Sequence, residues 1–161
     1  MNRFLTAVAI AAIPFAAAVA QTPMSGMTYV AKAGAGDQYE IQSSKLVLQT
    51  TQNAKLRSFA NMMIQDHTKS TADVKAAAQQ ARMTPPPPKL DAMGTRDVAA
   101  LRAAKGTARD QLYVTQQKAA HQRALALHQG YAANGTVAPL KAVAAQVAPV
   151  VQTHITELQS M

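Results

Sequence analysis

The stretch that decides the fold is residues 53–83, which read NAKLRSFANMMIQDHTKSTADVKAAAQQARM and contain neither Gly nor Pro. Apolar or small side chains, and one histidine, recur there every three or four residues, at positions 56, 59, 63, 67, 70, 74, 77 and 81. This spacing puts them on one face of a helix, as packing in a helical bundle requires. Asn53 precedes the repeat and is a residue type that caps helix starts. The stretch therefore predicts a long amphipathic helix over about 53–83.

The composition of the 161-residue chain also favours closely packed helices. It has 35 alanines, only 4% aromatic residues and no cysteine. A β-sandwich needs more branched and aromatic strand residues than this chain offers. The lack of cysteine excludes a disulfide framework, thiolate metal sites and cysteine catalysis. The length is that of one domain with a hydrophobic core of its own.

Three further long helices are expected at about 28–51, 107–133 and 136–160, the last capped by Thr136, with a short helix from Thr95 to Lys105. Four prolines at positions 85–88 end the second long helix and form a stiff extended spacer. Short links after the first and third long helices make their neighbours antiparallel. The expected fold is all-α, a four-helix bundle of two antiparallel hairpins joined by a Pro-rich crossover with a short extra helix.

The first twenty residues read as a secretory signal peptide. A positive start with Arg3 is followed by a short apolar run and a small-x-small site ending at Ala20. Pro14 interrupts that run, which is too short for a membrane anchor, and no later stretch is long and apolar enough to span a bilayer. We therefore expect cleavage near Ala20, a mature helical domain at 21–161 and a periplasmic or secreted protein.

The mature chain carries a surplus of positive charge. Without Arg3 it has 15 basic and 8 acidic side chains, a net charge of about +7. The basic residues are scattered singly and no aromatic platform lies between them, so nucleic acid is not the expected partner. The favoured interpretation of this charge is a solvated helical surface, and the alternative, given export, is non-specific contact with an anionic envelope surface. The sequence indicates no particular protein partner.

Three histidines, His67, His121 and His154, fall on the apolar faces of three different helices. On the last helix the predicted inward stripe is at positions 140, 143, 147, 150, 154 and 158. On the first helix a stripe at positions 29, 33, 36, 40, 43 and 47 places Glu40 inward. Buried imidazoles and carboxylates need partners, which are each other, water or a bound ion. Facing helices that supply inward Glu and His also build the metal sites of bundles. We hypothesise that these four residues hold a divalent or copper ion, since imidazoles suit Zn or Cu better than Ca or Mg. The alternative is that each polar side chain is hydrogen-bonded in a metal-free core.

Helix lengths allow a first check of whether these side chains lie at one depth. At 1.5 Å per residue, Glu40 and His67 lie roughly 17 and 21 Å from the first hairpin turn. His121 and His154 lie roughly 18 and 27 Å from the second turn, which is a poorer match. Asp66 points about 100° away from His67 around its helix. We therefore expect Asp66 to support the site or lie at the surface, and not to be a ligand.

The stretch at 59–68, FANMMIQDHT, resembles the signature FA..M..DHT of the domain of unknown function 4142 family. Further matches are Glu40, Asp110 and Tyr113, the segment from His121 to His128, and a closing P-x-x-x-x-H at 149–154. The resemblance covers nearly all of the mature chain. It implies a ferritin-like four-helix fold and an envelope location, and it brings no established activity.

The resemblance adds two supporting residues, Asp110 and Tyr113, which we expect near the site together with Asp66. Arg109 stands where relatives tend to have an aromatic residue, and we expect it to loosen packing there. Di-iron ferritins use two Glu-x-x-His pairs, which this chain lacks. A ferritin-like oxidase is therefore the third alternative, after a metal-binding protein without enzymatic activity and a metal-free interaction or structural module of the envelope.

Overall fold

The computed structural model describes residues 23–161, so the signal peptide expected at 1–20 lies outside the described residues. All regular structure in the described part is helical, which confirms the prediction of an all-α fold. The helices are α1 (Gly26–Leu48), α2 (Ala54–Gln80), α3 (Ala92–Ala103), α4 (Gly106–Asn134) and α5 (Ala138–Gln159).

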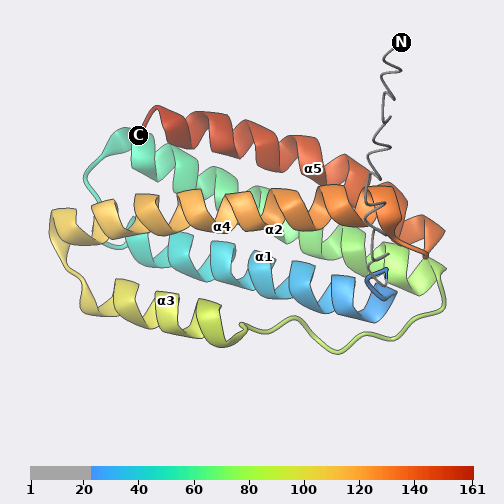
Figure 1. Ribbon diagram of the computed structural model, residues 1–161. Coiled ribbons are helices and arrows are strands. Elements are labelled where there is room, and N and C mark those ends of the chain that lie inside the picture. The colour runs from blue at the N-terminus through green and yellow to red at the C-terminus, as the bar shows by residue number, and fades with distance from the viewer. Residues whose placement is uncertain (1–22) are drawn as a thin grey trace, which may run out of the picture.

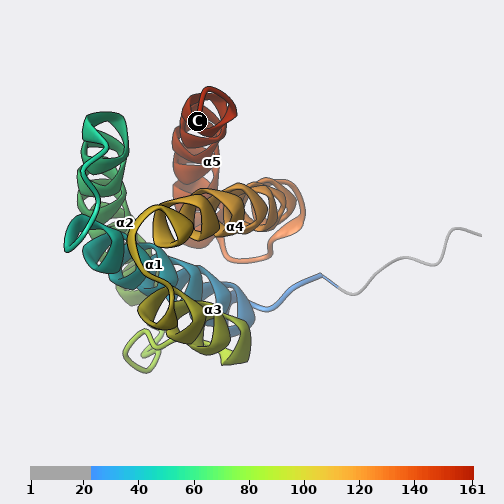
Figure 2. The same cartoon turned by 90° about the vertical axis from the view of Figure 1, so that its left-hand side faces the viewer.

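The four long helices form two hairpins that pack against each other (Figure 1). In one hairpin α1 packs on α2, and in the other α4 packs on α5. Contacts of α1 with α4 and of α2 with α5 join the hairpins, as expected in a four-helix bundle. The end-on view in Figure 2 shows α3 outside this ring, beside α1. The proline-rich crossover runs along the bundle from the end of α2 to α3 (Figure 1).

Side-chain caps fix where α1, α2 and α3 begin, and in α1 the cap is Ser25, whose hydroxyl accepts from the Thr28 N–H. The amide oxygen of Asn53 accepts a hydrogen bond from the Leu56 N–H at the start of α2, as expected. The short helix α3 starts earlier than predicted, because its cap is Asp91 and not Thr95. The Asp91 carboxylate accepts from the Gly94 N–H at 2.7 Å and faces the positive end of the helix dipole.

The start of α5 also differs from the prediction. Thr136 does not cap this helix, which begins at Ala138 after Val137, a residue whose side chain makes no cap hydrogen bond. Pro139 lies in the first turn, where its fixed φ suits a helix and its missing N–H costs nothing. The link from α4 to α5 is therefore longer than the sequence suggested.

The core contains two large apolar clusters with a polar layer between them, and a small third cluster of Tyr39, Val98 and Ala120 joins α3 to α1 and α4. One cluster joins the N-terminal half of α1 to the start of α5 and includes Tyr29, Val74, Tyr131 and Leu140. The other lies at the opposite end and includes Phe59, Met63, Tyr113 and Leu158. The side chains between the clusters are buried and polar, namely Asp37, Glu40, Ser43, His67, Gln117, His121 and His154.

The buried faces shift by one residue from the predicted stripes at two places. On α5, Val151 is buried and Val150 is 41% exposed, although the predicted stripe used Val150. On α1, Asp37 is buried and Gly36 is exposed, although the predicted stripe used Gly36. Both alternatives keep a three-four spacing, so periodicity alone does not choose between them.

Arg109 tightens the start of α4 instead of loosening it, so that expectation is wrong. Its side chain is buried, and its Nε donates to the backbone oxygen of Ala104 at 2.9 Å. The guanidinium also donates to Thr50 Oγ1 and to the carbonyl of Leu46 near the end of α1. Arg109 therefore ties α4 to the ends of α1 and α3.

Among residues 23–161, no helix combines the length and the apolar character needed to cross a membrane.

Candidate metal centre

His67 on α2, His121 on α4 and His154 on α5 meet inside the bundle, in the polar layer between the two apolar clusters. All three are at most 5% exposed. One ring nitrogen of each lies within 4.8 Å of a ring nitrogen of each of the other two. The closest approach joins His121 Nε2 to His154 Nδ1 at 3.3 Å. The structure therefore brings together three of the four side chains predicted to bind a metal.

His121 and His154 lie closer to one depth than predicted, because the helix ends differ from the prediction. Counted from Asn134 and Ala138, the observed bounds of the link, the two histidines lie roughly 20 and 24 Å from it. A difference of about 4 Å is less than one helical turn, which side chains can span.

The second nitrogen of each imidazole faces a hydrogen-bond acceptor. The pairs are His67 Nδ1 with Asp37 Oδ1 at 2.8 Å, His121 Nδ1 with the backbone oxygen of Gln117 at 3.0 Å, and His154 Nε2 with Asp66 Oδ2 at 3.0 Å. An acceptor at one ring nitrogen holds the proton there and leaves the lone pair of a neutral imidazole on the other nitrogen. Metal-binding histidines are held in this way by carboxylates and backbone carbonyls.

The convergent nitrogens suit a cation better than they suit each other. When the outer nitrogens carry the protons, His121 Nε2 and His154 Nδ1 present two lone pairs to each other at 3.3 Å. His67 Nε2 is buried and has no hydrogen-bond partner. In a tetrahedral site with metal–nitrogen bonds of about 2.0–2.1 Å, ligand nitrogens lie about 3.3 Å apart. The His121–His154 distance already has this value, and His67 needs a shift of about 1.5 Å at most by the same geometry.

The charges of the three histidines differ because their neighbours differ. Burial, together with the charges of the neighbouring His67 and His154, lowers the pKa of His121 to about 3. Burial likewise lowers the pKa of His154, although the hydrogen bond to Asp66 opposes this. Burial also acts to lower the pKa of His67, but its hydrogen bond to Asp37 and the charge of Glu40 outweigh burial and raise it. His121 and His154 are therefore neutral near pH 7, as metal ligands must be.

Glu40, the fourth predicted ligand, lies in the same layer but at a different edge of the imidazoles. Its Oε1 is 3.7 Å from His121 Nδ1, the nitrogen on the outer side of that ring. Its Oε2 is buried without a hydrogen-bond partner. Burial raises the pKa of Glu40 to about 7, against the opposing charge of His67. The structure thus places Glu40 against His121 and not among the three convergent nitrogens.

The three residues expected to support the site lie in different places. Asp66 contacts the cluster through His154 and not through His67, its neighbour in the sequence. Tyr113 is buried, shares a hydrogen bond with Ser44 at 2.7 Å and packs edge-on against Phe59.

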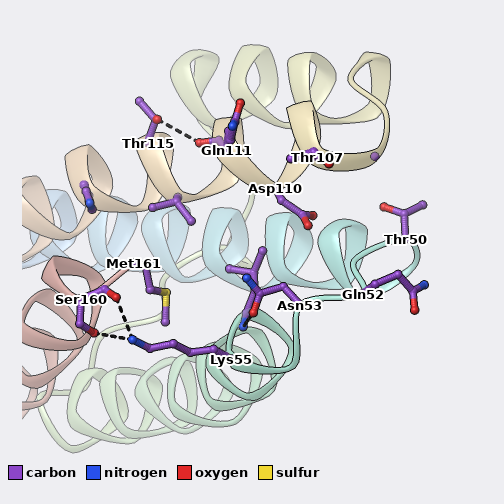
Figure 3. Close-up of a pocket in the computed structure, with 14 residues that line it drawn as sticks. Thr50, Gln52, Asn53, Lys55, Thr107, Asp110, Gln111, Thr115, Ser160 and Met161 are labelled. Atoms are coloured by element: carbon purple, nitrogen blue, oxygen red, sulfur yellow. Dashed lines mark hydrogen bonds between the residues drawn. The ribbon is translucent and has the colours of Figure 1, made fainter.

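Asp110 lies at the end of the bundle, where its Oδ2 accepts from Thr51 Oγ1 at 2.8 Å. Figure 3 shows Asp110 in a cavity there, with Asn53 and Met161. His121 lies eleven positions further along α4, about 16 Å along the helix. Asp110 therefore does not reach the cluster.

Two polar residues of the centre were not predicted from the sequence. Asp37 is 3% exposed and holds both His67 and Thr71, the latter through Oδ2 at 3.0 Å. It lies three residues before Glu40, so a stripe extended backwards from Glu40 in steps of three and four would have included it. Gln117 is fully buried and donates from Nε2 to Ser43 Oγ at 3.2 Å. It lies four residues before His121, which is one turn along the same face.

Sequence comparison identifies one family for this chain. The family model described as Domain of unknown function (DUF4142) matches residues 12–161. No protein of curated function matches the chain.

Two solved structures share the fold. One is the crystal structure of a DUF305 fragment from Deinococcus radiodurans, with a TM-score of 0.72 and 14% sequence identity, covering 84% of this chain and 93% of that one. The other is a DUF305 protein from Streptomyces coelicolor, described as a candidate secreted protein, with a TM-score of 0.68 and 15% identity. That match covers 83% of this chain and 88% of the other. At these identities the likeness concerns the fold alone.

Proposed function

This chain belongs to the DUF4142 family, and we propose that it is an exported helical-bundle protein that holds one Zn²⁺ or Cu²⁺ ion between His67, His121 and His154. One observation carries the proposal. The three imidazoles converge in the core while the outer nitrogen of each faces an acceptor. Such pairing is what orients metal-binding histidines, and a purely structural core has no need to point three lone pairs at one place.

The donor set indicates the class of metal. Three imidazole donors without thiolates suit Zn²⁺ and Cu²⁺, whereas Ca²⁺ and Mg²⁺ require oxygen ligands. The rings come from three helices packed in one bundle, so the site is largely formed before the ion arrives. A small adjustment of His67 completes the trigonal face and leaves a fourth position for water or another ligand.

Binding of one metal ion by the histidines is favoured over ferritin-like oxidase chemistry because of the positions of the carboxylates. A di-iron centre needs several carboxylate ligands at one level. Here the oxygens of Asp37 and Asp66 accept from the outer nitrogens of His67 and His154, so they lie behind the imidazoles. Glu40 approaches His121 from its outer nitrogen as well. These carboxylates are placed to orient ligands and not to bridge two irons.

An exported location is part of the proposal and rests on other observations. Residues 1–20 carry the charge pattern, apolar run and small-residue site of a secretory signal. The Streptomyces coelicolor protein that shares the fold is described as a candidate secreted protein. In the cell envelope, the net charge of about +7 on the mature chain would favour loose contact with anionic surfaces.

One observation favours a second candidate function, a metal-free structural or interaction module. His67 and His154 each have a carboxylate partner, and such pairs reduce the cost of burying polar groups. The bundle can therefore fold without an ion, with its polar layer fixing the register of the helices. In that case His67 Nε2 stays unpaired in the core.

Metal titration of tag-free protein separates the two candidates. The protein is stripped with a chelator and titrated with Zn²⁺ or Cu²⁺ in a calorimeter, beside His67→Ala and the control His128→Ala. We expect one ion per chain, at least about tenfold weaker binding in His67→Ala, and unchanged binding in His128→Ala, because His128 lies outside the cluster and its Nδ1 pairs with Tyr29 OH. Equal binding by all three proteins, or by none, would favour the metal-free module.

A further inference from the structure

A cleft of about 470 Å³ lies between α1, α3 and α4, and it extends inward to the polar layer. We call it the α1–α3–α4 cleft. Its deep part is lined by four buried residues, Asp37, Glu40, His67 and His128. Its outer part is lined by charged residues that reach the surface, Lys32, Asp91, Asp97 and Arg123.

With histidines counted as neutral, the formal charge of the residues that line this cleft is negative, whereas that of the rest of the chain is positive. The chain has 8 acidic and 16 basic residues. Four of the acidic residues line the cleft, compared with only two of the basic ones. A cleft with low-dielectric walls focuses the field of such carboxylates and raises the local concentration of cations.

Glu40 supplies a second and independent indication. It lines the cleft, it is 3% exposed, and its Oε2 has no hydrogen-bond partner. Burying such an oxygen is costly, so its presence needs a reason beyond packing. Its other oxygen lies 3.7 Å from His121, one of the three proposed ligands. A cation that reaches Glu40 is therefore one imidazole ring away from the cluster.

We infer that the α1–α3–α4 cleft is the route by which the metal ion enters the bundle. Asp91 and Asp97 attract the hydrated cation at the surface, although each already uses one oxygen in a local hydrogen bond, with the Gly94 N–H and with Arg96 respectively. Glu40 is the last oxygen donor before the histidines. This inference rests on the proposed metal site and adds to it the path of the ion.

Gly36 offers a way to close the route without breaking the fold. It lies on α1, lines the cleft, and a Cβ placed there meets no atom within 4 Å. We expect a tryptophan at this position to obstruct the cleft, and a non-glycine residue also suits the middle of a helix better. Gly130 on α4 is the matched control, because it too has open space around its Cβ and lies outside the cleft.

The test measures how fast and how tightly the ion binds. Four tyrosines and no tryptophan are present, so stopped-flow quenching of tyrosine fluorescence follows Cu²⁺ binding to the wild type. The tryptophan variants are followed by their own quenching and compared with each other. We expect Gly36→Trp to bind Cu²⁺ about tenfold or more slowly than Gly130→Trp, with the same number of ions bound at equilibrium. The double variant Asp91→Asn/Asp97→Asn should bind a few-fold more slowly than wild type, with a weaker dependence on ionic strength.

The outcomes separate this inference from the proposal on which it rests. If the wild type binds no ion, the proposed function fails. If it binds but Gly36→Trp matches Gly130→Trp and the double variant matches wild type, the ion enters elsewhere and the inference is overturned. Circular dichroism verifies that each variant is folded, and the double variant decides the question if Gly36→Trp is not.

Discussion

The clearest single test of how the histidines are held is the substitution Asp66→Asn. Asp66 Oδ2 accepts from His154 Nε2 at 3.0 Å, which leaves His154 Nδ1 to face His121. Asparagine keeps the shape and one acceptor oxygen but removes the charge. Because burial lowers the pKa of His154, that ring is neutral near pH 7.5 in both proteins, so no proton competes with the metal there.

The size of the effect follows from the exposure of the carboxylate. Loss of a carboxylate behind a metal-binding histidine weakens metal binding by about 10- to 100-fold, which is about 1.4–2.7 kcal/mol. The Asp66 side chain is 32% exposed, so solvent screens part of its charge. We therefore expect a loss near the lower limit, about tenfold, in the association constant for Zn²⁺.

Competition with a chromogenic zinc chelator at pH 7.5 measures this change. Asp73→Asn is the matched control, because Asp73 is on the same helix, is 38% exposed and pairs with Lys69 away from the histidines. The control should bind Zn²⁺ as wild type does. Unchanged affinity in Asp66→Asn, with the variant folded, would show that Asp66 does not orient a metal ligand.

Three further predictions concern the stability of the metal-free protein. Arg109→Ala should lower the free energy of unfolding in urea by about 2–3 kcal/mol, because several backbone carbonyls lose a charged donor. Arg109→Lys should recover only part of that free energy, and a loss below about 0.5 kcal/mol in Arg109→Ala would contradict the role given to Arg109. Phe59→Ala should cost about 3–5 kcal/mol, because Phe59 is 1% exposed and packs on the rings of Tyr113, His121 and His154, and a Tm close to that of wild type would refute this. Burial lowers the pKa of His128 to about 4, so the unfolded chain binds more protons between about pH 6.5 and 4 and stability falls as the pH falls through that window. Between pH 7 and 4, the free energy of unfolding of His128→Asn should therefore fall by about 3 kcal/mol less than that of wild type. Parallel curves of stability against pH for the two proteins would contradict this.

Most of the fold could be predicted because periodicity and breakers dominate this sequence. The three-four repeat of 53–83 and the cap at Asn53 locate α2 to within a few residues. The four prolines mark the crossover. The differences at the starts of α3 and α5 arise where several residues compete to be the cap. Asp91 outcompetes Thr95 because a carboxylate interacts more favourably with the helix dipole.

The candidate site was only partly predictable, for a physical reason. Helical spacing shows which face a histidine occupies, so the inward positions of His67, His121 and His154 could be read from the sequence. Spacing does not show which atoms meet across helices, because that depends on side-chain rotamers and on small shifts along the axes. The partnership of Asp66 with His154, two residues that lie 88 positions apart in the sequence, required the structure.

The burial of Asp37 could not be predicted from the sequence for a related reason. Its neighbour Gly36 fits a three-four stripe equally well, and only packing against α2 selects Asp37 for the core. The cost of this buried carboxylate is offset by His67 and Thr71. A single sequence does not show whether a residue is buried when its burial depends on such a partner.

X-ray absorption of the zinc-loaded protein tests the metal site most directly, because it reports the ligands around the ion itself. We predict a first shell that contains three imidazole nitrogens at about 2.0–2.1 Å, and one imidazole fewer in His67→Ala. A first shell made of oxygen alone, or an imidazole count that His67→Ala leaves unchanged, would contradict coordination by His67, His121 and His154.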